Sequence, residues 1–116
     1  MDIKLVTAII RRDRLESVEE KLKVVGVKRI NVTKAKGYGE YRNFFASDWM
    51  VDEVKLDIFT REQEVEGITG AIMEAAHTGV RGDGVVAVIS VDKLFLIRTK
   101  AEATSEEFWP KPREQT

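Results

Sequence analysis

The sequence has no cysteine, one histidine, two prolines and no long apolar run. Without cysteine, disulfides and thiolate metal sites are excluded. One histidine cannot form a zinc site, so we interpret His77 as a helix-end residue. No apolar run approaches the roughly 20 residues of a membrane-spanning helix. The first residues do not resemble a signal peptide, and we therefore expect a cytoplasmic protein.

The charges nearly balance. The net charge of the 116 residues is −1, although 34% of them are charged. Such a chain has no general attraction to polyanions, so nucleic acid is not expected as its partner. A hydrophobic fraction of 43% is typical of a globular protein. The length predicts a single domain with a modest core.

Apolar periodicity predicts strands and helices in a recognisable order. Helical spacing predicts helices at about 15–25 and 65–75. Strands are predicted at 3–10, 27–34, 54–58, 85–91 and, briefly, 94–97. The main order, strand-helix-strand-strand-helix-strand, is that of the α+β ferredoxin-like (βαββαβ) sandwich. We expect residues 1–100 to form this domain and residues 101–116 to form a polar tail, with Phe108-Trp109 as its apolar anchor.

Several sequence signals predict the ends of the helices. Residues 13–16 and 60–63 resemble capping boxes, in which a side chain at the helix start binds a backbone N–H. Gly26 is placed to end the first helix in the left-handed conformation. Gly79 is placed to end the second helix.

Two helices can cover only one face of such a sheet. The other face would still be apolar in several strands, and a domain of this size cannot hide it. We therefore expect oligomerisation with closed symmetry. Gly67 and Gly70 either weaken the second helix, by about 1 kcal/mol each relative to alanine, or permit close contact between helix and sheet.

The segment 78–84, Thr-Gly-Val-Arg-Gly-Asp-Gly, stands between the second helix and the fourth strand. Its three glycines allow left-handed backbone angles. Successive N–H groups in such a segment can point into one concavity, and a nest of this kind binds phosphate. Glycine-rich segments are also ordinary turns. Both interpretations stay open on the sequence pattern alone.

Four segments in order, 8–10, 36–39, 78–84 and 97–99, resemble the PII signal-transduction family. The match runs from about residue 3 to residue 99. The resemblance implies a compact homotrimer with three inter-subunit clefts that bind adenine nucleotides. It also implies a flexible T-loop that docks on transporters, enzymes or regulators. It implies no catalytic turnover. We expect no catalytic cofactor and, from the residue types above, no metal site.

The resemblance also implies the residues of the sites. Arg98 could alternatively form a plain surface ion pair, and the T-loop aromatics could pack within the trimer. The implied ligand-binding residues are Gly37, Phe59, Gly79, Arg81, Gly82, Asp83, Gly84 and Arg98. The implied partner-binding residues of the T-loop are Tyr41, Arg42, Phe44, Phe45 and Trp49.

The chain departs from the family where a triphosphate would be neutralised. Arg98 keeps its usual position, and Arg81 is an added cation. Fewer charge-assisted phosphate contacts should weaken the binding of ATP, so a nucleoside mono- or diphosphate is expected to bind at least as well as ATP. A side chain at Gly84 is expected to abolish binding by filling the nest. The departures are Val85, Glu53 (both lysine in the family), Leu96 (arginine) and Tyr41 (glutamine).

The T-loop is several residues shorter than in the family, and Trp49 stands where nitrogen-sensing members carry a modified tyrosine. We interpret the chain as a divergent PII-like regulator that binds a small effector, ADP or AMP rather than ATP, and acts on a partner such as a transporter. The alternatives are a nucleotide-independent trimeric adaptor and a sensor of another small ligand such as bicarbonate. Residues 11–14 resemble the anion loop of acylphosphatases, but the glycines and asparagine of that chemistry are missing. No nucleophile–base pair indicates an enzyme.

Overall fold

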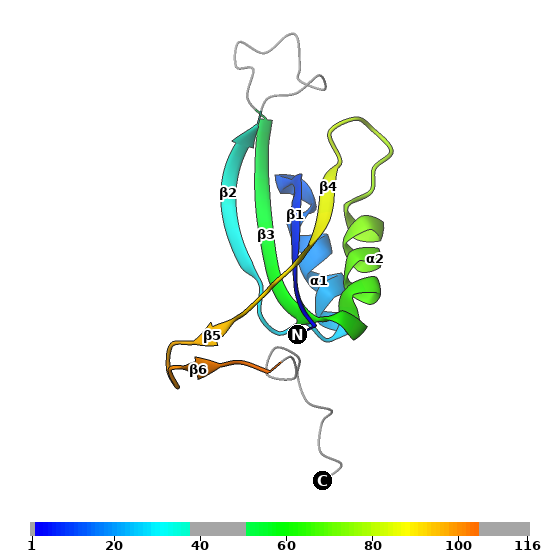
Figure 1. The fold of residues 1–116 in the computed structure, drawn as a ribbon. Helices are drawn as coiled ribbons and strands as arrows, with labels where there is room; N and C mark the ends of the chain where they lie inside the picture. The colour runs from blue at the N-terminus through cyan, green and yellow to red at the C-terminus, as the bar shows by residue number, and fades with distance from the viewer. Residues whose placement is uncertain (1, 38–50, 105–116) are drawn as a thin grey trace.

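The computed structural model describes residues 2–37 and 51–104 (Figure 1). Two α-helices and four main strands follow the predicted order, with a one-turn helix before each α-helix. The elements are β1 (Ile3–Arg11), η1 (Arg12–Arg14), α1 (Leu15–Val25), β2 (Asn31–Gly37), β3 (Val51–Arg61), η2 (Glu62–Glu64), α2 (Val65–Ala76), β4 (Gly84–Ser90), β5 (Phe95–Leu96) and β6 (Ala101–Glu102).

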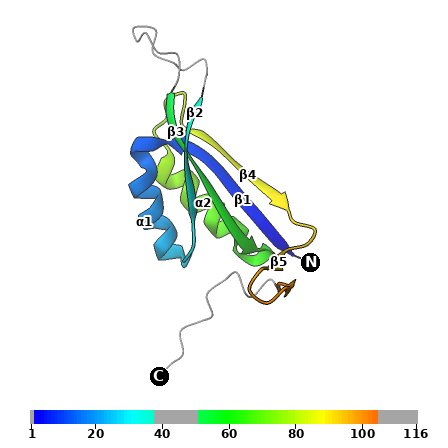
Figure 2. The same cartoon turned by 90° about the vertical axis from the view of Figure 1, so that its left-hand side faces the viewer.

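The four long strands form one antiparallel sheet in the order β2-β3-β1-β4. Both helices lie on the same face of this sheet, as the two views in Figures 1 and 2 show. β5 and β6 pair separately as a hairpin. A four-stranded antiparallel sheet with two helices on one face confirms the predicted ferredoxin-like α+β fold.

The core lies between the helices and the sheet. Val6, Ala8 and Ile10 alternate along β1 and are at most 1% exposed. They belong to one apolar cluster with Leu22 of α1 and Ile72 of α2. Full burial of a leucine or isoleucine side chain contributes about 1.5–3 kcal/mol, so this alternation is enough to fix which face of each strand turns inward.

The opposite face of the sheet carries apolar side chains that no helix covers. Leu5 of β1 pairs with Phe59 of β3 on one side and with Ile89 of β4 on the other. Ile89 is 48% exposed and Val85 is 64% exposed. Single exposed apolar residues are ordinary, but a row across three strands is typical of an interaction surface.

The two predicted capping boxes are wrong. Asp13 lies inside η1, the N-cap of α1 is Arg14, and no side chain caps that helix. Thr60 pairs with Lys4 within the β1–β3 ladder, so it belongs to a strand that continues to Arg61. The short pattern did not account for the one-turn helices that precede α1 and α2.

The first helix ends as predicted, and the second does not. Gly26 adopts a φ of 114° and its N–H donates to the carbonyls of Leu22 and Lys23, both at 3.1 Å. α2 ends at Ala76, with His77 in an extended conformation at its C-cap. Gly79 therefore belongs to the following loop, while His77 is the helix-end residue that the sequence indicated.

The second strand begins four residues later than predicted. The N–H of Val27 donates to the carbonyl of Leu22 at 3.0 Å, so Val27 completes the end of α1. Its side chain is 8% exposed and belongs to the core. From the sequence alone, an apolar residue that packs at the end of a helix cannot be told from the first residue of the next strand, so the start of β2 was predicted too early.

Gly67 and Gly70 do not mediate a close approach. A β-carbon on Gly67 would lie 3.8 Å from Cγ1 of Val25, an ordinary contact, and one on Gly70 would meet nothing within 4 Å. The remaining alternative is that these two glycines weaken the second helix.

The first residues of the predicted tail belong to the β5–β6 hairpin. Ala101–Glu102 forms β6, and the N–H of Ala103 donates to the carbonyl of Leu94 at 2.8 Å. Ala103 is 1% exposed. The apolar pair Phe108-Trp109 lies outside the described residues. Within the described ranges, neither helix is long and apolar enough to cross a membrane.

Arg14 closes the end of α2 from the start of α1. Its Nε and Nη2 donate to the carbonyl oxygen of Ala75 at 3.1 Å and 2.6 Å. The last carbonyls of a helix have no partner within the helix, and they carry its partial negative charge. The guanidinium therefore satisfies an otherwise unpaired acceptor and joins the two helices.

We predict that Arg14→Gln lowers the free energy of unfolding by about 1–2 kcal/mol, because it removes a charged donor pair from a helix end. Urea unfolding at fixed protein concentration measures the change. Arg12→Gln is the matched control, since Arg12 is 58% exposed and lies 3.9 Å from Asp52. A control loss as large as that of Arg14→Gln would contradict the capping role.

Candidate functional site

The glycine loop, residues 78–84, joins α2 to β4 at one end of the sheet (Figure 1). Gly84 pairs with Ile10 near the end of β1, and Glu53 near the start of β3 pairs with Arg11. The end of β2 also lies here, because Gly37 pairs with Val51. The loop therefore lies at the end of the sheet to which residues 38–50 are connected.

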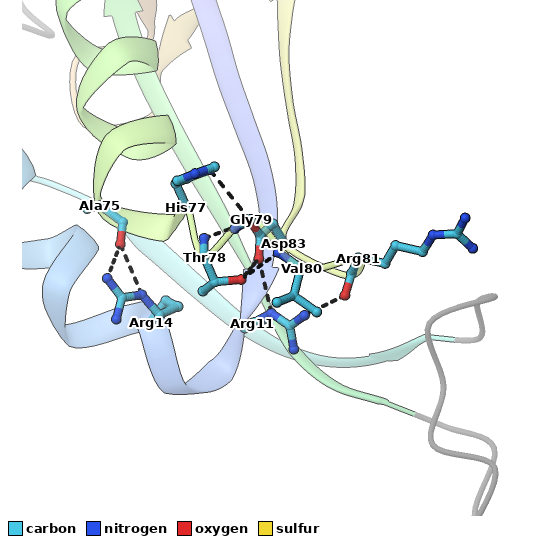
Figure 3. Close-up of polar contacts among 9 residues, drawn as sticks. All are labelled: Arg11, Arg14, Ala75, His77, Thr78, Gly79, Val80, Arg81 and Asp83. Atoms are coloured by element: carbon cyan, nitrogen blue, oxygen red, sulfur yellow. Dashed lines mark hydrogen bonds and ion pairs between the residues drawn. The ribbon is translucent and has the colours of Figure 1, made fainter.

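The carboxylate of Asp83 is the centre of this loop (Figure 3). Its Oδ2 accepts hydrogen bonds from the N–H groups of Thr78 at 2.7 Å and Gly79 at 2.9 Å. Its Oδ1 accepts from the Thr78 hydroxyl and from Nε of Arg11. The hydroxyl oxygen of Thr78 in turn accepts from the N–H of Val80 at 3.2 Å. One side chain thus closes the loop on itself.

These contacts stabilise the charged form of Asp83. The hydroxyl and then the N–H of Thr78 hold the pKa of the carboxyl well below its usual range, and Gly79 and Arg11 act in the same direction. Because the folded-state pKa is lowered, the stabilisation is present above the ordinary aspartate pKa. It is lost as the pH falls through that range toward the lowered value.

The first half of the loop therefore already binds an anion, the carboxylate of Asp83. The N–H groups of Thr78 and Gly79 point to Asp83, and that of Val80 to the Thr78 hydroxyl. The N–H groups of Thr78 and Gly79 converge as a nest requires, but they bind the internal carboxylate, and the N–H of Val80 binds a hydroxyl of the same loop.

Three glycines of the loop have backbone angles that other residues rarely adopt. Gly79, Gly82 and Gly84 have φ values of 86°, 99° and 111°. At Gly84 the space is also closed, because a β-carbon would lie 1.8 Å from the carbonyl oxygen of Ile9. A side chain at this position would therefore collide with β1, which differs from the expected filling of a phosphate nest.

The other predicted ligand-binding residues lie apart from the loop or extend from it. The side chain of Arg81 is exposed and extends away from the other residues of the loop (Figure 3). Phe59 is half-buried on the open sheet face opposite Leu5. Arg98 is exposed in the turn between β5 and β6, at the opposite end of the sheet from the loop (Figure 1). A single chain therefore does not bring Arg98 to the loop.

The predicted partner-binding residues of the T-loop lie outside the described residues. They are Tyr41, Arg42, Phe44, Phe45 and Trp49.

Two features of this region were missed by the sequence analysis. Arg11, which was considered only as part of an acylphosphatase-like segment, contacts the loop through Asp83 and through the carbonyl of Arg81. Its place at the end of the central strand was the available signal. The second feature is a pocket of about 420 Å³ beside the start of β3. It is lined by Arg12, Lys34, Ala35, Asp52 and Glu53.

The described residues hold no group of three or more histidine, cysteine, aspartate or glutamate side chains placed to bind a metal.

The model of the family described as "Nitrogen regulatory protein P-II" matches residues 3–101. The chain belongs to the P-II family. It is 38% identical to the nitrogen regulatory protein P-II of Azospirillum brasilense, over 84% of this chain and 93% of the relative. It is 33% identical to the nitrogen regulatory protein GlnK of Escherichia coli K12, over the same shares. Members of this P-II family are regulatory signalling proteins that bind effectors and have no catalytic cofactor.

A solved structure supports the fold assignment. The crystal structure of Arabidopsis thaliana PII bound to citrate aligns with a TM-score of 0.75 and 30% sequence identity. The alignment covers 88% of this chain and 89% of that one. The P-II membership that the motifs indicated and the ferredoxin-like fold that the order of helices and strands predicted are thus confirmed by sequence and by structure.

We predict that Gly84→Ala destabilises the protein, because the added methyl group forces Gly84 away from Ile9 and disturbs the β1–β4 pairing. Gly70→Ala is the control and should stabilise α2 by up to about 1 kcal/mol, since its site is open. Thermal unfolding of both variants measures the difference. An unchanged melting temperature for Gly84→Ala would contradict the close approach.

Proposed function

We propose that this P-II protein is a cytoplasmic homotrimeric regulator. A small effector, an adenine nucleotide with ADP or AMP preferred to ATP, binds between neighbouring copies. The bound effector changes how the T-loop engages a target protein such as a membrane transporter; the T-loop contains Tyr41, Arg42, Phe44, Phe45 and Trp49. The observation that carries the proposal is the intact glycine loop, which lies at the end of the sheet where β2 and β3 lead into the T-loop segment.

Two observations support the trimer. The open sheet face carries Leu5, Phe59 and Ile89 in one row across three strands, and a second copy would cover it. Arg98 lies in the turn of the β5–β6 hairpin, at the opposite end of the sheet from the glycine loop (Figure 1). An assembly in which the β5–β6 hairpin of one copy reaches the glycine loop of another would complete the predicted cleft.

The charges near the loop support the preference for fewer phosphates. Val85, the residue after the loop, is 64% exposed and apolar. Glu53 is 7% exposed and would place a carboxylate in the region where a triphosphate needs cations. Charge-assisted hydrogen bonds contribute about 1.5–3 kcal/mol each, so the missing cations reduce the advantage of a third phosphate.

The internal anion favours a second candidate function. Because Asp83 already occupies the amides of Thr78 and Gly79, the fold is complete without an effector. A nucleotide-independent trimeric adaptor would need no more than this. A sensor of another small anion, such as bicarbonate, would use the same loop with a smaller ligand, and a solved relative carries citrate.

We predict that the parent protein has three times the mass of one chain by light scattering, and that Ile89→Lys shifts it toward monomer. Ile89 lies on the open sheet face, which the trimer would cover, so a lysine there would become a buried charge without a partner. Val24→Lys is the control, because Val24 is 84% exposed on α1. A monomeric parent at micromolar concentration would rule out the trimer.

We predict that ADP or AMP binds at least as tightly as ATP in calorimetric titrations of the full-length protein. Arg98→Ala should weaken that binding by about 10- to 150-fold, which corresponds to one lost charged contact. Tight binding of ATP with weak binding of ADP and AMP would contradict the charge argument. If no adenine nucleotide binds but bicarbonate does, the protein is a sensor of a smaller anion. If neither a nucleotide nor bicarbonate binds, the nucleotide-independent adaptor is supported.

A further inference from the structure

The end of β1 lies directly against the glycine loop. Ile10 pairs with Gly84, and the backbone of Ile9 lies so close to Gly84 that no side chain fits there. The last residue of the loop is therefore fixed on β1. Arg11, the final residue of that strand, lies beside the loop (Figure 3).

Arg11 makes two contacts with the loop. Its Nε lies 3.2 Å from Oδ1 of Asp83, and its Nη2 donates to the carbonyl oxygen of Arg81. The side chains of Arg11 and Asp83 are 26% and 25% exposed, so water screens this pair less than an ion pair on the open surface. The two contacts hold both residues that flank Gly82.

The contact with the Arg81 carbonyl sets the direction of the next amide. The described peptide bonds are all trans, so the N–H of Gly82 points opposite to the carbonyl of Arg81. Because this carbonyl faces Arg11, the Gly82 N–H faces away from Arg11. Arg11 thus selects the side of the loop on which this donor is presented.

Asp83 holds the rest of the loop in the same arrangement. Its carboxylate joins the first residues of the loop, Thr78 and Gly79, to the end of β1 through Arg11. Removal of either charged partner breaks the contact between Arg11 and Asp83, which is the link between the first residues of the loop and β1. We call this pair, Arg11 with Asp83, the clasp.

We propose that Arg11 and Asp83 are positioning residues for the effector. The clasp holds the glycine loop in the shape that presents the Gly82 amide to an anionic group, and neither side chain touches the effector. This inference rests on the proposed function, in which a nucleotide phosphate lies at the loop. It assigns Asp83, which the motif suggested as a ligand contact, to the loop itself.

The test is a double-mutant cycle on the full-length assembled protein, measured by calorimetric titration with ADP. Arg11→Gln and Asp83→Asn are made singly and together. Each single variant is expected to bind ADP about 10-fold more weakly, and the double variant no more weakly than the weaker single one. Thr78→Val removes a donor to Asp83 while both charges stay, and it should also weaken ADP binding. It replaces Arg11→Gln in the test if that variant does not fold.

Arg61→Gln is the matched control for loss of an arginine at a strand end. Arg61 lies 3.0 Å from Glu64, with exposures of 25% and 24%, at the opposite end of β3 from Glu53. It should lower the melting temperature about as much as Arg11→Gln, and change ADP affinity by less than about twofold. An equal loss of affinity in the control would show a general effect of stability and overturn the inference.

The remaining outcomes separate the inference from the proposed function. Additive losses in the cycle, or a loss of ADP affinity in Arg11→Gln but not in Asp83→Asn, would mean that Arg11 contacts the effector directly and would overturn the positioning role. If the parent binds ADP and both single variants do so equally well, only the inference is overturned. If the parent binds no ADP, the proposed nucleotide function is overturned together with it.

Discussion

The pairing of β1 on both of its edges is the constraint on which this structure depends. β3 pairs with one edge and β4 with the other, over nearly the whole strand. The position at which β1 ends therefore fixes where the glycine loop enters β4 and where β3 begins. The close contact between Ile9 and Gly84 shows how little freedom is left there. The position of the candidate site is therefore set by where β1 ends.

The fold could be predicted because it follows from a repeating burial pattern. Alternation along β1 and helical spacing in α1 and α2 each involve several residues, so single exceptions do not obscure them. The ends of elements depend on one or two residues and were less predictable. Val27 seals α1 instead of starting β2, and Thr60 remains in β3 because the ladder with β1 extends that far.

The candidate site was predictable only where backbone conformation requires a particular residue. The glycines at 79, 82 and 84 identified the loop because their positive φ values exclude most side chains. The contact of Asp83 with Arg11 joins residues 72 positions apart in the sequence, and no local pattern encodes it. Arg98 lies in the turn of the β5–β6 hairpin, at the opposite end of the sheet from the loop, and no local pattern encodes that separation.

The bond from Arg14 to Ala75 has a consequence for how the helical layer opens. It spans 61 residues, so the end of α2 is complete only when the start of α1 is in place. Lys21 and Glu74 join the same two helices farther along. Loosening of the start of α1 is therefore expected to free the last turn of α2 as well, so that the amides of both segments exchange with solvent together.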